Sequence, residues 1–492
     1  MKNPKSLSPG IIRGVIYSSI SNIISKVGAL VFTIIIARML FPELFGIYSL
    51  VLTIIITLTT LSDLGLGSAA SRYISESVGN RNKIQARSRF QFLLKFKGIA
   101  SLIIVFILFI LSGTIAVLFK KPELALPLKI GSIYLLINSF YWTITPVFLS
   151  FQKLKYSAIA ELIFQISRIV LVFIFLYFFK NVEVIFIALA ISMIFSLIFA
   201  YIVLRKKFSF LIKGKIEPVE RRRILKFSGY LTIGSIGAMI FGNIDKLILG
   251  YYVAAKLIGI YAAITTLIGA AFGILAFGGT VFLPAFTQLN GKRLERAFKK
   301  AFHYLSLIII PSATGLAFLA IPLIRLLYGA DYVPITIRSS MIITSALLSL
   351  LIIENAFTAI YAVLFNAREK TKITAILNIT TSAITIILSI VFIILFIKIN
   401  VDYSLIAVAI AAFIGRYIGL FATMYICRTK IKISPNIASI VKPLIASLFM
   451  LGYMFLFRNY IHLTVLTGIV LILTSMMVYF ILIKGLKGLK FE

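Results

Sequence analysis

The stretch ARMLFPELFGIYSL, residues 37–50, joins two apolar runs that are each long enough to cross a lipid bilayer. Each run also carries a polar stripe and an ionisable residue, which lipid does not tolerate. A related stretch, DKLILGYYVAAKLIGIYAA at 245–263, follows in the second part of the chain. Its GIY at 259–261 repeats the GIY at 46–48, each after a short turn and at the start of an even-numbered run. The matching positions predict an internal repeat whose halves face a shared, charge-lined cavity.

The composition is that of an integral membrane protein. Of the 492 residues, 61% are hydrophobic and 13% are charged, whereas a soluble domain is about half apolar and about a quarter charged. A spanning helix needs about 20 mainly apolar residues, and runs of this kind predict an all-α fold. The fourteen predicted spans cover 14–40, 44–69, 98–119, 127–150, 157–179, 183–204, 227–252, 257–284, 302–327, 334–365, 373–397, 402–427, 437–457 and 463–483.

The positive charges predict the topology of these spans. The 50 Lys and Arg residues outnumber the 15 Asp and Glu residues, and we assign the surplus to cytoplasmic loops and not to a nucleic-acid partner. Basic connections alternate with nearly neutral ones, so we expect a multi-pass protein of the cell (cytoplasmic) membrane with both termini cytoplasmic. We also expect the first span to be retained and not to be a signal peptide. The cations on the opposite side are Lys120, Lys121, Lys129, Lys180, Lys256, Lys398 and Arg458.

The longest polar connection, at 205–226, divides the chain after the sixth span. We therefore predict a six-helix bundle at 1–210, a second at 211–432, and two additional helices at 433–492. Six is an even number, so the two bundles have the same orientation and are related by an axis along the membrane normal.

Several classes of function are disfavoured by the sequence. It has no P-loop to grip a phosphate, so direct drive by ATP is not expected. One Cys and two His argue against disulfides and against a metal centre. The acids in the spans occur singly and not as a close pair for hydrolysis. We therefore expect neither an enzyme nor a bound cofactor.

Charged residues inside spans point to a polar site. A mid-membrane charge costs about 3 kcal/mol on insertion scales, so Lys26, Asp63 and Lys246 are expected to face protein or water. Asn22 and Asn243 lie on the polar faces of the same helices, which we expect to meet across the repeat axis. Two simpler explanations stay open: small polar residues let helices pack closely, and Lys26 with Asp63 could form an ion pair of purely structural purpose.

Other ionisable residues lie deeper in the spans. Glu161 and Arg168 are seven residues apart on one helical face, and Arg416 lies in the twelfth predicted span. Glu354 in the tenth is the best isolated acid for a coupling-ion site. For charges near span ends, snorkelling to lipid headgroups is the simpler explanation. These are Arg38, Arg72, Asp245, Arg325 and Arg338.

Three stretches resemble a known family. ARMLFPELFGIYSL (37–50), SDLGLGSAASRYISE (62–76) and NIDKLILGYYVAAKLIGIYAA (243–263) are similar to those of polysaccharide (O-antigen type) flippases. That family belongs to the multidrug/oligosaccharidyl-lipid/polysaccharide exporter superfamily, whose pattern of six, six and two spans this chain matches. The resemblance implies a V-shaped pair of bundles that moves a lipid-linked oligosaccharide to the outer leaflet by alternating access.

The resemblance also implies which side chains form the site. Helices one, two, seven and eight would line the cavity, and basic residues would meet the phosphate or diphosphate of the lipid carrier, which cannot enter a low-dielectric cavity unpaired. The expected substrate-binding residues are Lys26, Arg38, Arg72, Lys246, Asn22, Asn243, Arg168 and Arg416. The expected groups for a coupling ion, H⁺ or Na⁺, are Asp63, Glu354 and Asp245.

The hypothesis is a monomeric flippase for a polyprenyl-linked saccharide. Its expected partners are this substrate, membrane lipids, and glycosyltransferases or a polymerase of the same pathway. Three alternatives stay open: a multidrug/cation antiporter of the same fold, a membrane scaffold for glycan-assembly enzymes without transport of its own, and a passive lipid scramblase.

Overall fold

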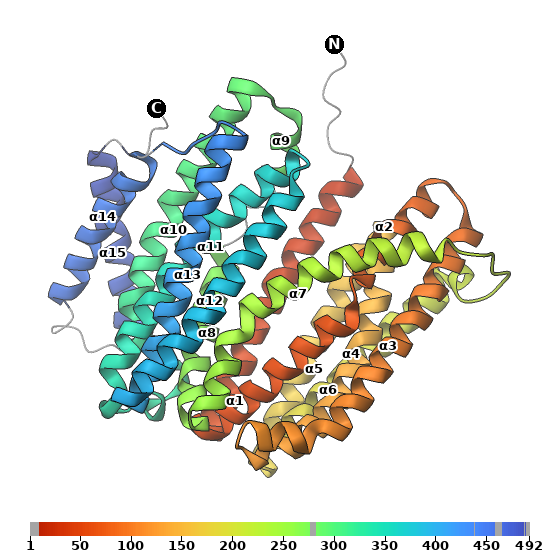
Figure 1. The fold of residues 1–492 in the computed structure, drawn as a ribbon, viewed down its shortest axis with the longest axis horizontal. Coiled ribbons are helices and arrows are strands. Elements are labelled where there is room, and N and C mark those ends of the chain that lie inside the picture. The colour runs from red at the N-terminus through yellow and green to blue at the C-terminus, as the bar shows by residue number, and fades with distance from the viewer. Residues whose placement is uncertain (1–8, 276–281, 437, 458–464, 487, 489–492) are drawn as a thin grey trace. The chain divides into compact units, whose positions relative to one another are not determined.

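The computed structural model describes residues 9–275, 282–436, 438–457, 465–486 and 488, and every regular element in this part of the chain is a helix (Figure 1). The predicted all-helical fold is confirmed. Two compact units, Met1–Gly259 and Ile260–Glu492, divide the chain, and each is described by itself. The bundle boundaries predicted from the repeat stay a prediction.

The first unit contains long helices joined by short turns. They are α1 (Pro9–Asp63), α2 (Leu66–Gly79), α3 (Lys83–Leu118), α4 (Ala125–Ser150), α5 (Leu154–Phe178), α6 (Glu183–Lys207) and α7 (Arg221–Tyr252). Within the unit α1 packs on α5, α4 and α7, α3 packs on α4, and α6 packs on both α4 and α5. α8 (Ala255–Leu275) begins in this unit and continues into the second.

The stretch between the first two predicted spans interrupts α1. Phe41 has φ 60° and ψ 169°, and helical geometry resumes at Pro42. Proline disfavours helical backbone in the residue before it and has no N–H to leave unbonded at a helix start. α1 is therefore two consecutive helices, and these correspond to the predicted spans 14–40 and 44–69. In Figure 1 the chain descends in red, turns and returns in orange-red.

The two GIY copies meet through their glycines. A methyl group on Gly46 would overlap the carbonyl oxygen of Ala255, and a methyl group on Gly259 would overlap the carbonyl oxygen of Pro42. Each glycine thus packs against backbone beside the other, which only a residue without a Cβ allows. This reciprocal contact supports the internal repeat that the sequence predicts.

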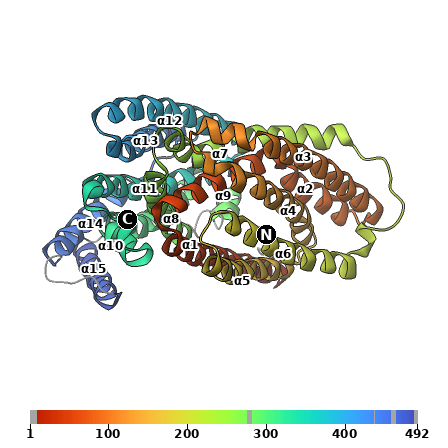
Figure 2. The ribbon, with the colours of Figure 1, turned by 90° about the horizontal axis from the view of Figure 1, so that it is seen from below.

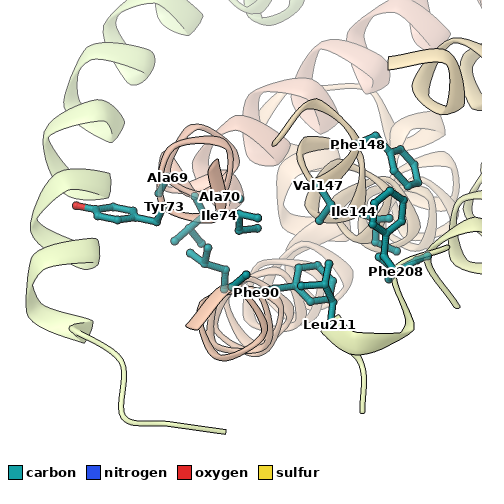
Figure 3. Close-up of a cluster of buried hydrophobic side chains, with 14 of the residues drawn as sticks. Ala69, Ala70, Tyr73, Ile74, Phe90, Ile144, Val147, Phe148, Phe208 and Leu211 are labelled. Atoms are coloured by element: carbon teal, nitrogen blue, oxygen red, sulfur yellow. The ribbon is translucent and has the colours of Figure 1, made fainter. Parts of the chain in front are cut away.

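An apolar cluster holds α2 and α3 to the rest of the first unit. Figure 3 shows Ile74 of α2 close to Phe90 of α3, and Phe148 of α4 near Phe208 after α6. The predicted span 44–69 runs past the end of α1 into α2, whereas residues 70–79 of α2 and the first fifteen residues of α3 were not predicted to be helical. Their polar side chains belong to amphipathic helices, whose apolar faces this cluster buries.

The second unit is built from helices of similar length. They are α9 (Leu283–Gln288), α10 (Gly291–Tyr328), α11 (Arg338–Ala367), α12 (Thr371–Ile399), α13 (Ser404–Lys430), α14 (Ala438–Phe457) and α15 (Val465–Gly485). Figure 2 shows α12 beside α13 and α14 beside α15, and both pairs are in contact. The last two helices pack on α10, where the Tyr479 hydroxyl donates to the Leu307 carbonyl at 2.9 Å.

The apolar surface of the helices is that of a membrane protein. Twelve ranges of the described residues are long and apolar enough to cross a bilayer. The first, Ser21–Gly79, contains two of the predicted spans, and α7 is not among the twelve. Large apolar side chains lie exposed on several of them, such as Phe106 at 66% and Ile387 at 61% exposure. The end of the eighth predicted span, 276–281, lies outside the described residues.

Candidate functional site

Asp63 is placed by the turn that ends α1. Leu64 (φ 46°) and Gly65 (φ 67°) reverse the chain before α2 begins at Leu66. A side chain on Gly65 would approach the carbonyl oxygen of Ser228 on α7, so this left-handed turn requires glycine. The carboxylate of Asp63 consequently lies beside the first turn of α2, where the helix dipole favours a negative charge.

Lys97 of α3 is the ion-pair partner of Asp63. Its Nζ lies 2.5 Å from Oδ1 of Asp63, and the lysine side chain is 3% exposed while the aspartate side chain is 35% exposed. The sequence left open an ion pair of Asp63 with Lys26 and placed Lys97 just before the predicted span 98–119. α3 starts at Lys83 instead, and the long helix carries Lys97 into the bundle. Lys26 is exposed on α1.

The ion pair lines a cavity of about 780 Å³ enclosed by α1 to α6 of the first unit. Thr59, Thr60 and Ser71 lie on its wall, and each hydroxyl donates to a carbonyl four residues earlier. Their oxygens therefore keep lone pairs that can accept hydrogen bonds from a ligand. The other polar and aromatic lining residues include Ser68, Asn138, Ser157, Tyr134, Tyr141 and Trp142.

Arg168 of α5 provides an unsatisfied cation in this cavity. Its guanidinium lies over the rings of Phe32 and Phe164, with the Cζ atom 4.6 and 5.0 Å from the ring centres. Nε and Nη2 are buried, and within the described residues neither has a hydrogen-bond partner. Buried donors are nearly always bonded, and these two, which water does not reach, are exceptions beside the cavity.

Glu161, two helical turns before Arg168, also lines the cavity. Its Oε1 accepts a hydrogen bond from the Gln165 amide at 2.6 Å. With Asp63 and Lys97, the cavity wall carries two acids and two bases, so their formal charges cancel. The chamber suits a ligand rich in hydroxyl groups that carries at most a local charge.

The structure brings together two of the sequence-predicted site residues, Asp63 and Arg168. Several others lie on the same unit outside the cavity wall. On α1, Asn22, Lys26 and Arg38 are exposed. On α7, Asn243, Asp245 and Lys246 are partly exposed, and the Asp245 carboxylate accepts from the Lys246 amide at 2.9 Å.

Arg72 of α2 lies in an aromatic contact instead. Its guanidinium is over the Phe227 ring of α7, with 4.4 Å between Cζ and the ring centre. The neighbouring Tyr73 donates from its hydroxyl to the Arg223 carbonyl at 3.4 Å. Arg72 therefore takes part in the contact between α2 and α7 at the basic end of the unit.

Two predicted residues lie in the second unit. Glu354 of α11 is 5% exposed, and its Oε1 accepts from the Thr358 hydroxyl at 2.8 Å. Arg416 of α13 is the charged group that interacts with it electrostatically. Glu354 is buried and Arg416 is partly exposed, and neither lines the cavity of the first unit.

Sequence reasoning missed Lys97 and the aromatic wall. Lys97 directly precedes the apolar run that starts at Gly98. This position could have indicated a lysine at the membrane end of a basic helix. Tyr134, Tyr141 and Trp142 lie on one predicted span, and an aromatic group of this kind in a span that also contains Asn138 was a signal for a polar pocket.

The sequence profile of a family described as polysaccharide biosynthesis protein matches residues 11–290, which is more than half of the chain. The chain belongs to the polysaccharide biosynthesis protein family. The match includes the whole cavity of the first unit. An uncharacterized membrane protein of Methanocaldococcus jannaschii is 24% identical over 310 residues. The match covers 58% of this chain and 61% of the relative, so it spans less than two thirds of that protein.

Solved structures of similar fold come from membrane transporters. Lipid II flippase MurJ in an inward closed conformation has a TM-score of 0.75 at 20% identity. The match covers 95% of this chain and 98% of MurJ. An inward-facing multidrug resistance MATE family transporter of the MOP superfamily has a TM-score of 0.67 at 19% identity, with 85% and 98% covered. These similarities establish the fold. The protein is thus a multi-pass membrane protein with the helical fold of flippases and transporters.

Proposed function

We propose that this protein moves a polyprenyl-linked oligosaccharide across the cytoplasmic membrane by alternating access, without chemical conversion. The family and the fold support transport in polysaccharide biosynthesis. The single observation that carries the saccharide is the first-unit cavity, whose walls offer hydroxyl, amide and aromatic groups with balanced charge. The lipid tail stays in the bilayer while the head group passes, which keeps the hydroxyl groups out of hydrocarbon.

Each group of the cavity has a role in this proposal. The guanidinium of Arg168, which lines the cavity, binds an acceptor on the head group, either a phosphate or a sugar oxygen. The hydroxyl oxygens of Thr59, Thr60 and Ser71 accept hydrogen bonds from sugar hydroxyls. The remaining expected contacts, Lys26, Arg38, Arg72, Lys246, Asn22, Asn243 and Arg416, stay proposals.

Asp63 is the proposed group for a coupling ion, H⁺ or Na⁺, since protonation of its carboxylate would release Lys97. Glu354 and Asp245 are the other proposed coupling groups. Both termini are proposed to be cytoplasmic because the basic connections would then face the cytoplasm. A monomer is proposed to act beside glycosyltransferases or a polymerase of the same pathway.

The test is transport by the purified protein in vesicles. Fluorescent polyprenyl-diphosphate oligosaccharide prepared from the source organism is placed in one leaflet, and its appearance in the other is followed. We expect Arg168→Gln to slow translocation about tenfold or more, which corresponds to the loss of about 1.4 kcal/mol or more. Arg338→Gln, a change at an exposed arginine at the start of α11, is the control and should leave the rate unchanged.

The same assay separates the alternatives. Equal movement of lipids with any head group would identify a scramblase, and no movement would support a scaffold. The carboxylates of Asp63 and Glu161 in the cavity are the observation that favours an antiporter of hydrophobic cations. Proton-driven uptake of ethidium without movement of the glycan would therefore replace the flippase proposal with that function.

A further inference from the structure

A second pocket lies at the end of the first unit opposite the basic connections. α3 and α7 both start at the basic end, and their far ends meet the turn of α1 around a pocket of about 520 Å³. Three turns supply its walls: the α1 turn with Glu43, the turn after α3 with Lys120 and Glu123, and the end of α7 with Tyr251. The volume is within the usual range for ligand sites, about 300–1,000 Å³.

Two tyrosine rings form one wall of this pocket. Tyr251 and Tyr252 are in edge-to-face contact, with ring centres 4.9 Å apart, and they are 42% and 39% exposed. Their faces are large, rigid and apolar, and each carries a hydroxyl that can donate or accept. The left-handed backbone at Lys120, φ 54°, ends α3 and turns the chain toward the pocket.

The lysines of the pocket are already engaged. Lys121 is 8% exposed, and its Nζ donates to the carbonyls of Gly250 at 2.7 Å and Phe119 at 3.2 Å. Burial lowers the pKa of its ammonium group. Lys120 lies over the Tyr251 ring at 5.7 Å. Lys121 is therefore not placed to receive a phosphate, whereas Lys120 is exposed.

The carboxylates are the available charged groups. Glu43 and Glu123 are exposed in the pocket, and in the part of the chain that the structure describes neither has a recorded ion pair or side-chain hydrogen bond. Carboxylates accept hydrogen bonds and cannot donate them when ionised. Together with two tyrosine faces they match a ligand that has many hydroxyl donors and apolar C–H faces.

We propose that this pocket binds a saccharide, namely the head group of the exported substrate after it has crossed the membrane. This inference rests on the proposed function, which supplies the substrate and the orientation that puts the pocket outside. Glu43 and Glu123 accept hydrogen bonds from sugar hydroxyls, and Tyr251 and Tyr252 contact the apolar faces of the sugar rings. An anionic lipid headgroup is disfavoured because it would meet two exposed carboxylates and only one exposed lysine, Lys120.

The test measures binding of a soluble probe to the full chain in nanodiscs. The probe is the oligosaccharide mixture released by mild acid from the polyprenyl-lipid fraction of the source organism and labelled with 2-aminobenzamide. We expect the wild type to bind it, with affinity about tenfold lower in Tyr251→Ala and severalfold lower in Glu123→Gln. Matched controls are Tyr177→Ala and Glu183→Gln, which change residues at the same end of the unit but outside the pocket. Their affinity should equal that of the wild type.

Three results would overturn the proposal. The first is no binding of the probe by the wild type, and the second is binding that the pocket variants leave unchanged. The third is displacement of the probe by spermidine, which would identify the carboxylates as a cation site. Parallel transport assays keep the two proposals separate. If the wild type transports the lipid-linked glycan and the pocket variants bind the probe normally, only the pocket proposal is disproved. Protein that binds the probe through Tyr251 but moves no lipid-linked glycan would disprove only the flippase.

Discussion

The two members of the Asp63–Lys97 ion pair differ strongly in their access to water. Lys97 is 3% exposed and Asp63 is 35% exposed. Removal of one partner from a buried pair costs about 3–5 kcal/mol, whereas an exposed pair contributes about 0–1 kcal/mol. The cost therefore depends on which charge is left behind.

We predict that Asp63→Asn destabilises the protein more than Lys97→Met does. Asp63→Asn leaves a buried ammonium group without a counter-charge. We expect this to cost about 2–3 kcal/mol, a value between the range for an exposed pair and the range for a buried pair. Lys97→Met leaves a carboxylate that water can reach, so its cost should be smaller. Thermal unfolding in nanodiscs of both single variants and the double variant gives the coupling energy. Equal losses from both single changes would contradict the prediction.

The control is an exposed pair of similar geometry. Glu295 and Lys299 lie one turn apart on α10 with 2.6 Å between their charged atoms, and both are about one-third exposed. Glu295→Gln should cost at most about 0.5 kcal/mol.

The sequence could identify Asp63 and Arg168 but not their surroundings. Both are ionisable residues in apolar runs, and the cost of such a charge in lipid is enough to predict that each faces protein or water. Which group each one meets depends on how α1, α3 and α5 pack. Neither the ion pair with Lys97 nor the unsatisfied donors of Arg168 can be derived from spacing along one helix.

At the scale of elements, the connection from α6 to α7 is bound to α3 by side chains that donate to its backbone. Arg87 donates from Nη1 to the Lys215 carbonyl at 2.9 Å and from Nε to the Phe210 carbonyl. Gln91 donates from Nε2 to the Ile212 carbonyl at 2.9 Å. The connection is therefore ordered even though its composition is that of a polar loop.

We predict that Arg87→Ala releases this connection. Hydrogen bonds from a charged donor contribute about 1.5–3 kcal/mol, so trypsin cleavage at Lys213 and Lys215 should accelerate about tenfold or more. Peptide mass spectrometry during limited proteolysis gives the rate. Lys95→Ala, which removes an exposed cation from the same helix, should leave cleavage as in the wild type. Equal acceleration in both variants would contradict a specific role of Arg87.

The start of α7 is predicted to respond to acid. Arg89 is 1% exposed and donates to Glu220 at 3.0 Å, and this hydrogen bond lowers the pKa of the Glu220 carboxyl. Because the pKa of Glu220 is lower in the folded state, its carboxylate contributes fully to stability above the pKa of the unfolded state, about 4.3. This contribution is lost as the pH falls through the pKa of the folded state. Wild type should therefore lose more stability below about pH 4 than Glu220→Gln does.

Melting temperatures measured between pH 7 and the onset of acid unfolding check this prediction. Glu217→Gln is the control, because Glu217 contacts Ser88 through its backbone amide and not through its carboxylate. If Glu220→Gln and Glu217→Gln follow the same acid profile, Glu220 is not the responsible group.

The helices could be predicted from the sequence where the apolar runs are long. The break at Phe41 lies between the predicted spans 14–40 and 44–69, and the predicted spans 127–150 and 157–179 lie close to α4 and α5. Most of α2 and the start of α3 escaped prediction because their charged residues resemble those of a loop. Only the tertiary contacts of the apolar cluster show that these segments are helical.

At the scale of the whole molecule, the paired glycines link the two copies of the repeat. We predict that Gly46→Ala and Gly259→Ala each lower stability by about 1–3 kcal/mol, because each added methyl group overlaps a backbone carbonyl that cannot rotate away. Gly113→Ala is the control, since no atom lies within 4 Å of its added methyl group. Alanine there should be neutral or stabilising by up to about 1 kcal/mol.

Thermal unfolding in nanodiscs measures all three variants. A loss of stability in Gly113→Ala as large as in Gly46→Ala would show that alanine is harmful in these helices generally. In that case the close approach of the two GIY copies would not be the cause.

The balance of charges in the first-unit cavity has an electrical consequence. The formal charges of two acids and two bases on the cavity wall cancel. A movement of this wall within the membrane therefore moves no net charge through the transmembrane voltage. In the proposed transport, the charges of the substrate and of a coupling ion do the electrical work, about 2.3 kcal/mol per elementary charge at 100 mV. If the proposed function holds, an anionic carrier phosphate leaves a cytoplasm that is electrically negative, and the membrane voltage favours its outward movement.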